Sequence, residues 1–109
     1  MGPWVIPKEE VGDPYPLRME LKVGGTVRQA GDTSDYIFRI PQVIEHLTKG
    51  ITLEPGDLIS LGSLGGTPGY EFGKESRWLA SGDSIEGSIE KIGRLVVPVK
   101  SEAPPPPAG

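Results

Sequence analysis

The chain has 109 residues, the length of a single domain, and its hydrophobic fraction of 36% with 6% aromatic residues predicts a small core. A net charge of -4 without a basic cluster argues against a nucleic-acid partner, because phosphate binding depends on Lys and Arg. The lack of cysteine excludes disulfides and thiolate catalysis, and the lack of a long apolar run or a signal-like N-terminus predicts a cytoplasmic protein with no membrane contact.

The N-terminal part of the chain predicts a proline-rich entry followed by a β-hairpin. Residues 1–16 contain four prolines, which favour extended or turning backbone over helix, and Trp4–Ile6 suits one short strand. Apolar and polar residues then alternate over Leu17–Val23, which is the period of a half-buried strand. Gly24-Gly25 is a hairpin signal, so a second strand is predicted over Thr26–Gln29.

The middle of the chain predicts a turn, a short buried segment and one helix. Turn-forming residues occupy positions 30–35, where we expect Thr33-Ser34-Asp35 to order the loop. The apolar run Tyr36-Ile37-Phe38 predicts a buried segment. A helix is then predicted over Pro41–Lys49, stopped by Gly50 and weakly capped at its start because no Ser or Asp precedes it. Its apolar face carries Val43, Ile44 and Leu47.

Gly-Asp pairs precede the strands that we predict in the second half of the chain. Pro55-Gly56 favours a type II turn, and the apolar run Leu58–Leu61 after it predicts a strand. Gly82-Asp83 likewise comes before a strand predicted over Ser84–Glu90, and a short turn then leads to a last strand at Leu95–Val97.

The C-terminus predicts a change from folded domain to tail. Four consecutive prolines, Pro104–Pro107, cannot join a sheet. No internal repeat of the kind found in solenoids divides the rest of the chain. We therefore expect a half domain at residues 1–102 and a Pro-rich disordered tail at residues 103–109.

The glycine-rich stretch 56-GDLISLGSLGGTPGYEFG-73 does not match the motifs that such loops often form. A phosphate-binding P-loop needs a Lys directly after its last glycine, and none follows Gly66. The dinucleotide motif G-x-G-x-x-G must open a helix, which Pro68 prevents. A nucleophile elbow needs a glycine two residues before Ser63, where a leucine stands, and its triad would depend on His46, which lies off the apolar face of the predicted helix.

Three segments resemble the C-terminal half of the fumarylacetoacetate hydrolase superfamily. They are 17-LRMELKVGGTVRQAGDTSDYIFRIPQVIEHL-47, 51-ITLEPGDLISLGS-63 and 91-KIGRLVVPV-99. The first segment is similar to two successive family patterns, L-x-L-x-V-N-G-x-x-R-Q and N-T-S-D-M-I-F-x-I-P-x-L-I. The second is similar to L-x-P-G-D-x-I-x-T-G-T-P-x-G and the third to I-G-x-L-x-N-x-V. The resemblance is collinear over residues 1–99 and implies a mainly β fold with one short helix, forming part of a mixed β-roll.

The resemblance also implies an activity and a division of labour. Members of the superfamily use Mg²⁺ or Mn²⁺ to act on acylpyruvates and other 2-oxo acids, by C–C bond hydrolysis, decarboxylation or diene isomerisation, and usually form dimers. Their metal ligands and catalytic Lys lie upstream of the segment that matches Gly2-Pro3-Trp4, while Glu9-Glu10 and the Asp32/Asp35 pair here have the pattern of solvated loop charges. We therefore expect no metal ligand and no catalytic residue on this chain, and activity only with an N-terminal-half polypeptide or in a homo-oligomer.

The resemblance places the substrate site directly after the strand predicted over 58–61. Ser63 matches the second threonine of T-G-T-P by its distance from the Pro-Gly-Asp turn, and its hydroxyl would help to anchor the carboxylate of a small 2-oxo acid. A slipped register would place Thr67 there instead. Gly62 and Gly65 would let the backbone approach the ligand closely.

Some departures from the family pattern leave a second function open. Gly87 stands where an apolar β-branched residue is usual and weakens the strand interior. Arg28 and Gln29 are interpreted first as exposed residues at a strand end, with a supporting role in the active site as the alternative. The alternative to an enzyme part is a non-catalytic β module that serves as a structural or interaction surface. Such a module would show no metal-dependent activity with any partner.

Overall fold

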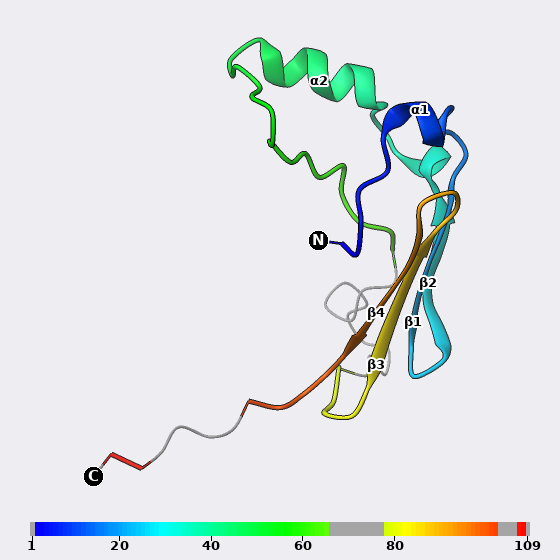
Figure 1. Ribbon diagram of the computed structural model, residues 1–109, viewed down its shortest axis with the longest axis vertical. Helices are drawn as coiled ribbons and strands as arrows, with labels where there is room; N and C mark the ends of the chain where they lie inside the picture. The colour runs from blue at the N-terminus through cyan, green and yellow to red at the C-terminus, as the bar shows by residue number, and fades with distance from the viewer. Residues whose placement is uncertain (1, 66–77, 103–106, 109) are drawn as a thin grey trace.

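Figure 1 shows the computed structural model, which describes residues 2–65, 78–102 and 107–108. Its centre is an antiparallel sheet of four strands in the order β2-β1-β3-β4. The four strands are β1 (Arg18–Val23), β2 (Thr26–Asp32), β3 (Ser84–Ile89) and β4 (Gly93–Pro98). The predicted tail at 103–109 falls mostly outside the described residues.

The β1–β2 hairpin is confirmed, and β2 continues three residues beyond its predicted end. Gly24 and Gly25 both have positive φ, 56° and 79°, which is the backbone of a tight type I′ turn. The register shifts by one residue between Leu21 and Lys22, because Leu21 pairs with Gln29 and Lys22 with Val27. The residue between these two partners on β2 is therefore a β-bulge.

The two Gly-Asp turns have the same hydrogen bonds, although only the second leads into a strand. Asp57 N–H donates to the carbonyl of Glu54 at 3.1 Å, and the Asp57 carboxylate accepts the N–H of Glu54 at 2.8 Å. Asp83 and Ala80 repeat this exchange at 3.0 Å and 2.8 Å. The aspartate thus closes each turn from both directions. The strands predicted after the second turn are confirmed as β3 and β4.

The predictions for the N-terminal segment and for 58–61 are wrong. Trp4–Ile6 forms no strand, and the helix α1 (Lys8–Val11) follows Pro7, which suits a helix start. The Trp4 indole instead donates to the carbonyl of Ile92 at 2.6 Å. Leu58–Leu61 forms no strand, because no described strand lies beside it to share hydrogen bonds.

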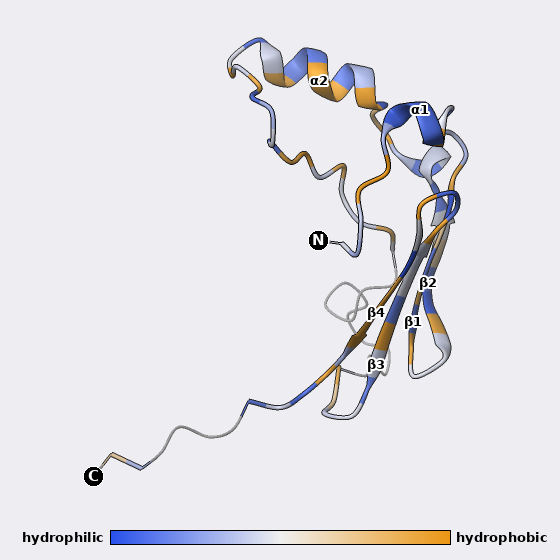
Figure 2. Ribbon diagram, viewed as in Figure 1, coloured by the Kyte–Doolittle hydropathy of each residue, from blue (hydrophilic) through white to orange (hydrophobic). Residues whose placement is uncertain are grey.

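The predicted helix is confirmed as α2 (Ile40–Thr48), but the buried segment before it is wrong. Ile37 and Phe38 are 88% and 63% exposed, because nothing in the described part of the chain covers them. In place of a capping Ser or Asp, the Gln42 side chain accepts the N–H of Arg39 at 2.9 Å. Figure 2 shows apolar and polar bands on α2. Among the described residues, no helix is long and apolar enough to cross a membrane.

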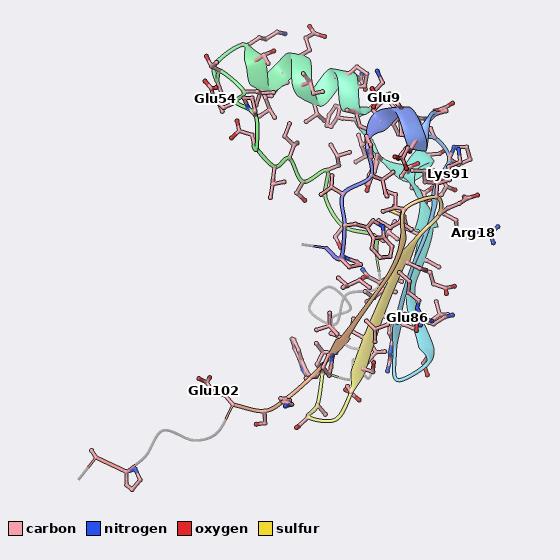
Figure 3. The ribbon with its side chains drawn as sticks, viewed as in Figure 1. Glu9, Arg18, Glu54, Glu86, Lys91 and Glu102 are labelled. Atoms are coloured by element: carbon pink, nitrogen blue, oxygen red, sulfur yellow. The ribbon has the colours of Figure 1, made fainter. Side chains whose placement is uncertain are left out.

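The sheet has one apolar and one polar face. Residues that pair directly across antiparallel strands share a face, and the pairs Met19–Ile89, Val23–Ile85 and Ile85–Val97 define the apolar one. The polar face carries the ion pairs Lys22–Glu20 and Arg94–Glu86. In Figure 3 the labelled Arg18 and Glu86 lie on the side of the sheet away from the N-terminal segment.

The apolar face is only partly covered. Leu17 and Val23, 3% and 8% exposed, are the buried hydrophobic residues in the described ranges. Leu95 and Val97, which lie on this face of the outermost strand β4, are 40% and 44% exposed. The small core predicted from the composition is therefore an open one.

Candidate functional site

The candidate site is a loop that we call the lip, residues 62–65, which contains most of the predicted site residues. Gly62 has a φ of 111°, a conformation that favours glycine, and its N–H donates to the Ser60 hydroxyl at 3.4 Å. Ser63 is exposed, and its hydroxyl donates to the carbonyl of Leu64 at 3.3 Å. Gly62, Ser63 and Gly65 thus lie together, whereas Thr67 lies outside the described residues.

The lip is attached to the edge strand β2 by the side chain of Gln29. Its amide nitrogen donates to the carbonyl of Leu64 at 2.6 Å and to that of Gly65 at 3.3 Å. Close packing supports the same contact, because a Cβ on Gly31 would lie 2.9 Å from the Leu64 Cδ2. The interpretation of Gln29 as an exposed strand-end residue missed this contact, since sequence spacing does not show which loop a strand meets.

A hollow of about 300 Å³ lies between the lip, the apolar face of the sheet and the N-terminal segment. Trp4 closes one side, packed so tightly on the β3–β4 turn that a Cβ on Gly93 would lie 2.6 Å from its Cζ2. Gly87 opens the floor by leaving out a side chain beneath Leu21. The hollow is therefore mainly apolar, with the Gln29 amide among its polar groups.

The acidic residues considered above do not form a cation site. Asp35 accepts the N–H of Asp32 at 3.0 Å, and Asp32 accepts the N–H of Ser34 at 2.6 Å, so both carboxylates order the loop as predicted for this segment. Within the described ranges, no group of three His, Asp or Glu side chains lies close enough to hold a metal ion. Because Mg²⁺ and Mn²⁺ are bound through several oxygen ligands, these residues do not fit such an ion. His46 is exposed on α2.

A comparison of the sequence with known protein families shows which family the chain belongs to. The pattern described as "Fumarylacetoacetate (FAA) hydrolase C-terminal" matches residues 1–100. The chain belongs to the fumarylacetoacetate hydrolase family. The family and the fold class expected from the sequence, mainly β with one short helix, are both confirmed.

Individual relatives within the family are enzymes with different names. The chain is 44% identical to the oxaloacetate tautomerase YisK of Bacillus subtilis and 43% identical to a 2,4-didehydro-3-deoxy-L-rhamnonate hydrolase of Sphingomonas sp.. These matches cover 87% and 85% of the chain but 31% and 32% of the relatives. The chain therefore spans about a third of the length of these relatives.

Solved structures show the same partial coverage. Maleylpyruvate hydrolase from Sphingobium sp. SYK-6, also solved with manganese and pyruvate, is 32% identical with a TM-score of 0.78, over 91% of this chain and 34% of that one. Fumarylpyruvate hydrolase from Pseudomonas aeruginosa, in complex with Mn²⁺ and pyruvate, is 28% identical with a TM-score of 0.74, over 88% and 37%. The relatives thus include metal-binding enzymes that act on acylpyruvates.

Proposed function

We propose that this chain is the C-terminal, substrate-contacting part of a divalent-metal-dependent enzyme that acts on acylpyruvates or other 2-oxo acids. The reaction would be C–C bond hydrolysis, decarboxylation or isomerisation. The observation that carries the proposal is the lip, an exposed hydroxyl between two glycines held at the sheet edge. It occurs in a chain whose relatives include hydrolases and a bifunctional isomerase/decarboxylase.

In this proposal Ser63 binds the carboxylate of the substrate. Its present bond to the carbonyl of Leu64 is long, at 3.3 Å, so the hydroxyl can exchange it for a shorter bond to a charged oxygen. Gly62 and Gly65 leave room for the ligand to reach the backbone. Thr67 is the second candidate for the same role. The Mg²⁺ or Mn²⁺ would be held by the rest of the enzyme, because the described residues do not fit it.

We further propose that an N-terminal-half polypeptide covers the apolar face, with a homo-oligomer as the alternative arrangement. The support is the exposure of Leu95 and Val97, which share that face with the hollow, and the outer edge of β4, which no other described strand pairs. An open strand edge with apolar side chains is the kind of surface that proteins normally cover. We take residues 1–102 as the half domain, since β4 ends at Pro98 and the family match ends at residue 100.

Complementation tests the proposal directly. The chain is combined with the N-terminal two-thirds of a relative such as the B. subtilis tautomerase, and acylpyruvate hydrolysis and oxaloacetate turnover are measured with Mg²⁺ or Mn²⁺. Ser63→Ala should lower kcat/KM of the assembled enzyme by about 10- to 150-fold, as expected for one lost bond to a charged group. Ser101→Ala is the matched control, because that hydroxyl also donates to the next carbonyl, at 3.4 Å, but lies outside the sheet and the lip.

The non-catalytic β module remains a second candidate, favoured by the lack of a metal-ligand group in the described ranges. It predicts no metal-dependent activity with any partner and a stable chain without one. Ser63→Ala would then change neither binding nor stability. Full activity of the isolated chain with added metal would contradict both functions.

A further inference from the structure

We infer that Gln29, brought into place by the β-bulge before it, is the positioning residue of the lip and fixes the location of the Ser63 hydroxyl. The inference rests on the proposed function, in which that hydroxyl binds substrate. Gln29 would not touch the substrate through this role. It acts through the carbonyls of Leu64 and Gly65, which its amide binds at 2.6 Å and 3.3 Å.

The bulge decides which way Gln29 points. At the hairpin end, Val23 pairs with Thr26 and Lys22 with Val27, and an unbroken ladder would next pair Leu21 with Arg28. That register would place Arg28 on the apolar face and Gln29 on the polar one, away from the lip.

The observed ladder differs by one residue. Leu21 pairs with Gln29, and Arg28 is the extra residue of the bulge. A one-residue bulge therefore turns the amide toward the lip and keeps the Arg28 charge off the apolar face.

The fit between β2 and the lip is close as well as hydrogen-bonded. A Cβ on Gly31, two residues after Gln29 on the same strand, would meet the Asp35 carboxylate at 2.7 Å and the Leu64 Cδ2 at 2.9 Å. Both neighbours are closer than a real Cβ tolerates. The strand thus contacts Leu64 at two points, through a hydrogen bond at Gln29 and through packing at Gly31. Ser63 lies directly beside the residue that is held.

Because Gln29 is the donor in both hydrogen bonds, the inference can be tested by replacing its amide nitrogen with an oxygen. Gln29 acts as a donor to two carbonyls, so Gln29→Glu replaces the donor by a carboxylate that repels them. Gln42 supplies a matched control, because it acts as an acceptor for the N–H of Arg39 at 2.9 Å. Gln42→Glu keeps that acceptor and should leave the molecule unchanged.

The first experiment measures ¹⁵N backbone order parameters in the full chain. In the wild type, the lip amides should have values near those of a rigid backbone, about 0.85, and in Gln29→Glu they should fall below about 0.6 while β1 and β3 stay unchanged. Gln29→Ala, which removes the donor without adding charge, should give the same result and serves if Gln29→Glu does not fold. A mobile lip in the wild type, or an unchanged lip in either variant, would overturn the inference.

The second experiment uses the complemented enzyme and asks whether Gln29 acts through Ser63. Gln29→Glu should raise KM for the 2-oxo acid by about tenfold. In the double variant with Ser63→Ala, kcat/KM should be no lower than in Ser63→Ala alone, since the residue being positioned is gone. Multiplicative losses would overturn the inference. If no partner restores activity, the proposed function fails while the order parameters still decide whether Gln29 holds the lip.

Discussion

Replacing Thr33 by Val should destabilise the chain by about 2–4 kcal/mol. Thr33 is 8% exposed, and its hydroxyl accepts the N–H of buried Leu17 at 2.9 Å and donates to the carbonyl of half-buried Pro14. Val has nearly the same shape but no polar atom, so both backbone groups lose their partner, at about 1–3 kcal/mol each. Because Pro14 is only half-buried, water can replace its lost partner, so the lower part of the summed range applies.

Urea unfolding followed by circular dichroism measures this loss. With a slope of about 1 kcal/mol per molar, the midpoint should fall by roughly 2 M or more at an unchanged slope. Thr48→Val is the control, because the Thr48 hydroxyl donates to carbonyls of its own helix at 2.9 Å and 3.2 Å on an exposed surface. That variant should stay within about 0.5 kcal/mol of the wild type. Equal shifts for the two variants would refute the argument that the buried hydroxyl matters.

Two further substitutions test the sheet. Gly87→Val should raise the free energy of unfolding by about 0.5–1 kcal/mol and with it the urea midpoint, because glycine weakens a strand interior. A Cβ at position 87 meets the Leu21 Cδ1 at an ordinary 3.9 Å, so there is room for it. A lower midpoint would mean that the hollow does not accept the side chain. On the polar face, the Lys22 ammonium donates a hydrogen bond to the Glu20 carboxylate, which raises the pKa of Lys22 above its ordinary value. The stabilisation by this ion pair is complete below the ordinary pKa of lysine and is lost as the pH rises through the raised pKa of Lys22. Glu20→Gln should therefore shift the Lys22 titration, followed by NMR, to lower pH. Glu45→Gln is the control and should leave that titration unchanged.

The sequence predicts correctly those helices and strands that depend on neighbouring residues alone. The hairpin follows from alternation and from Gly24-Gly25, and α2 follows from Pro41 and the spacing of its apolar residues. The runs at 36–38 and 58–61 were predicted to be buried or paired, yet Ile37 and Leu58 are 88% and 74% exposed. An apolar run shows that burial would be favourable, but it does not show whether another segment lies close enough to cover it.

The candidate site shows the same division between local and distant causes. The composition and family pattern of the lip point to Ser63 and its glycines. The role of Gln29 depends on a single extra residue in the ladder, which alternation alone does not reveal, because both registers begin from the same turn. A family pattern therefore identifies the loop that meets the ligand more readily than the residue that holds the loop.

Because part of the apolar face is exposed, the free energy of unfolding of this chain depends on whether a partner binds that face. Any molecule that binds that face in the native state and not in the unfolded one adds RT ln(1 + [L]/Kd) to the stability, about 2.7 kcal/mol at a hundred times Kd. For a chain with two hydrophobic residues buried in its described ranges, such a term is comparable to the loss expected for Thr33→Val. The melting temperature then becomes a measure of partner concentration, so a thermal shift across a series of candidate N-terminal halves ranks their affinities without any enzymatic assay.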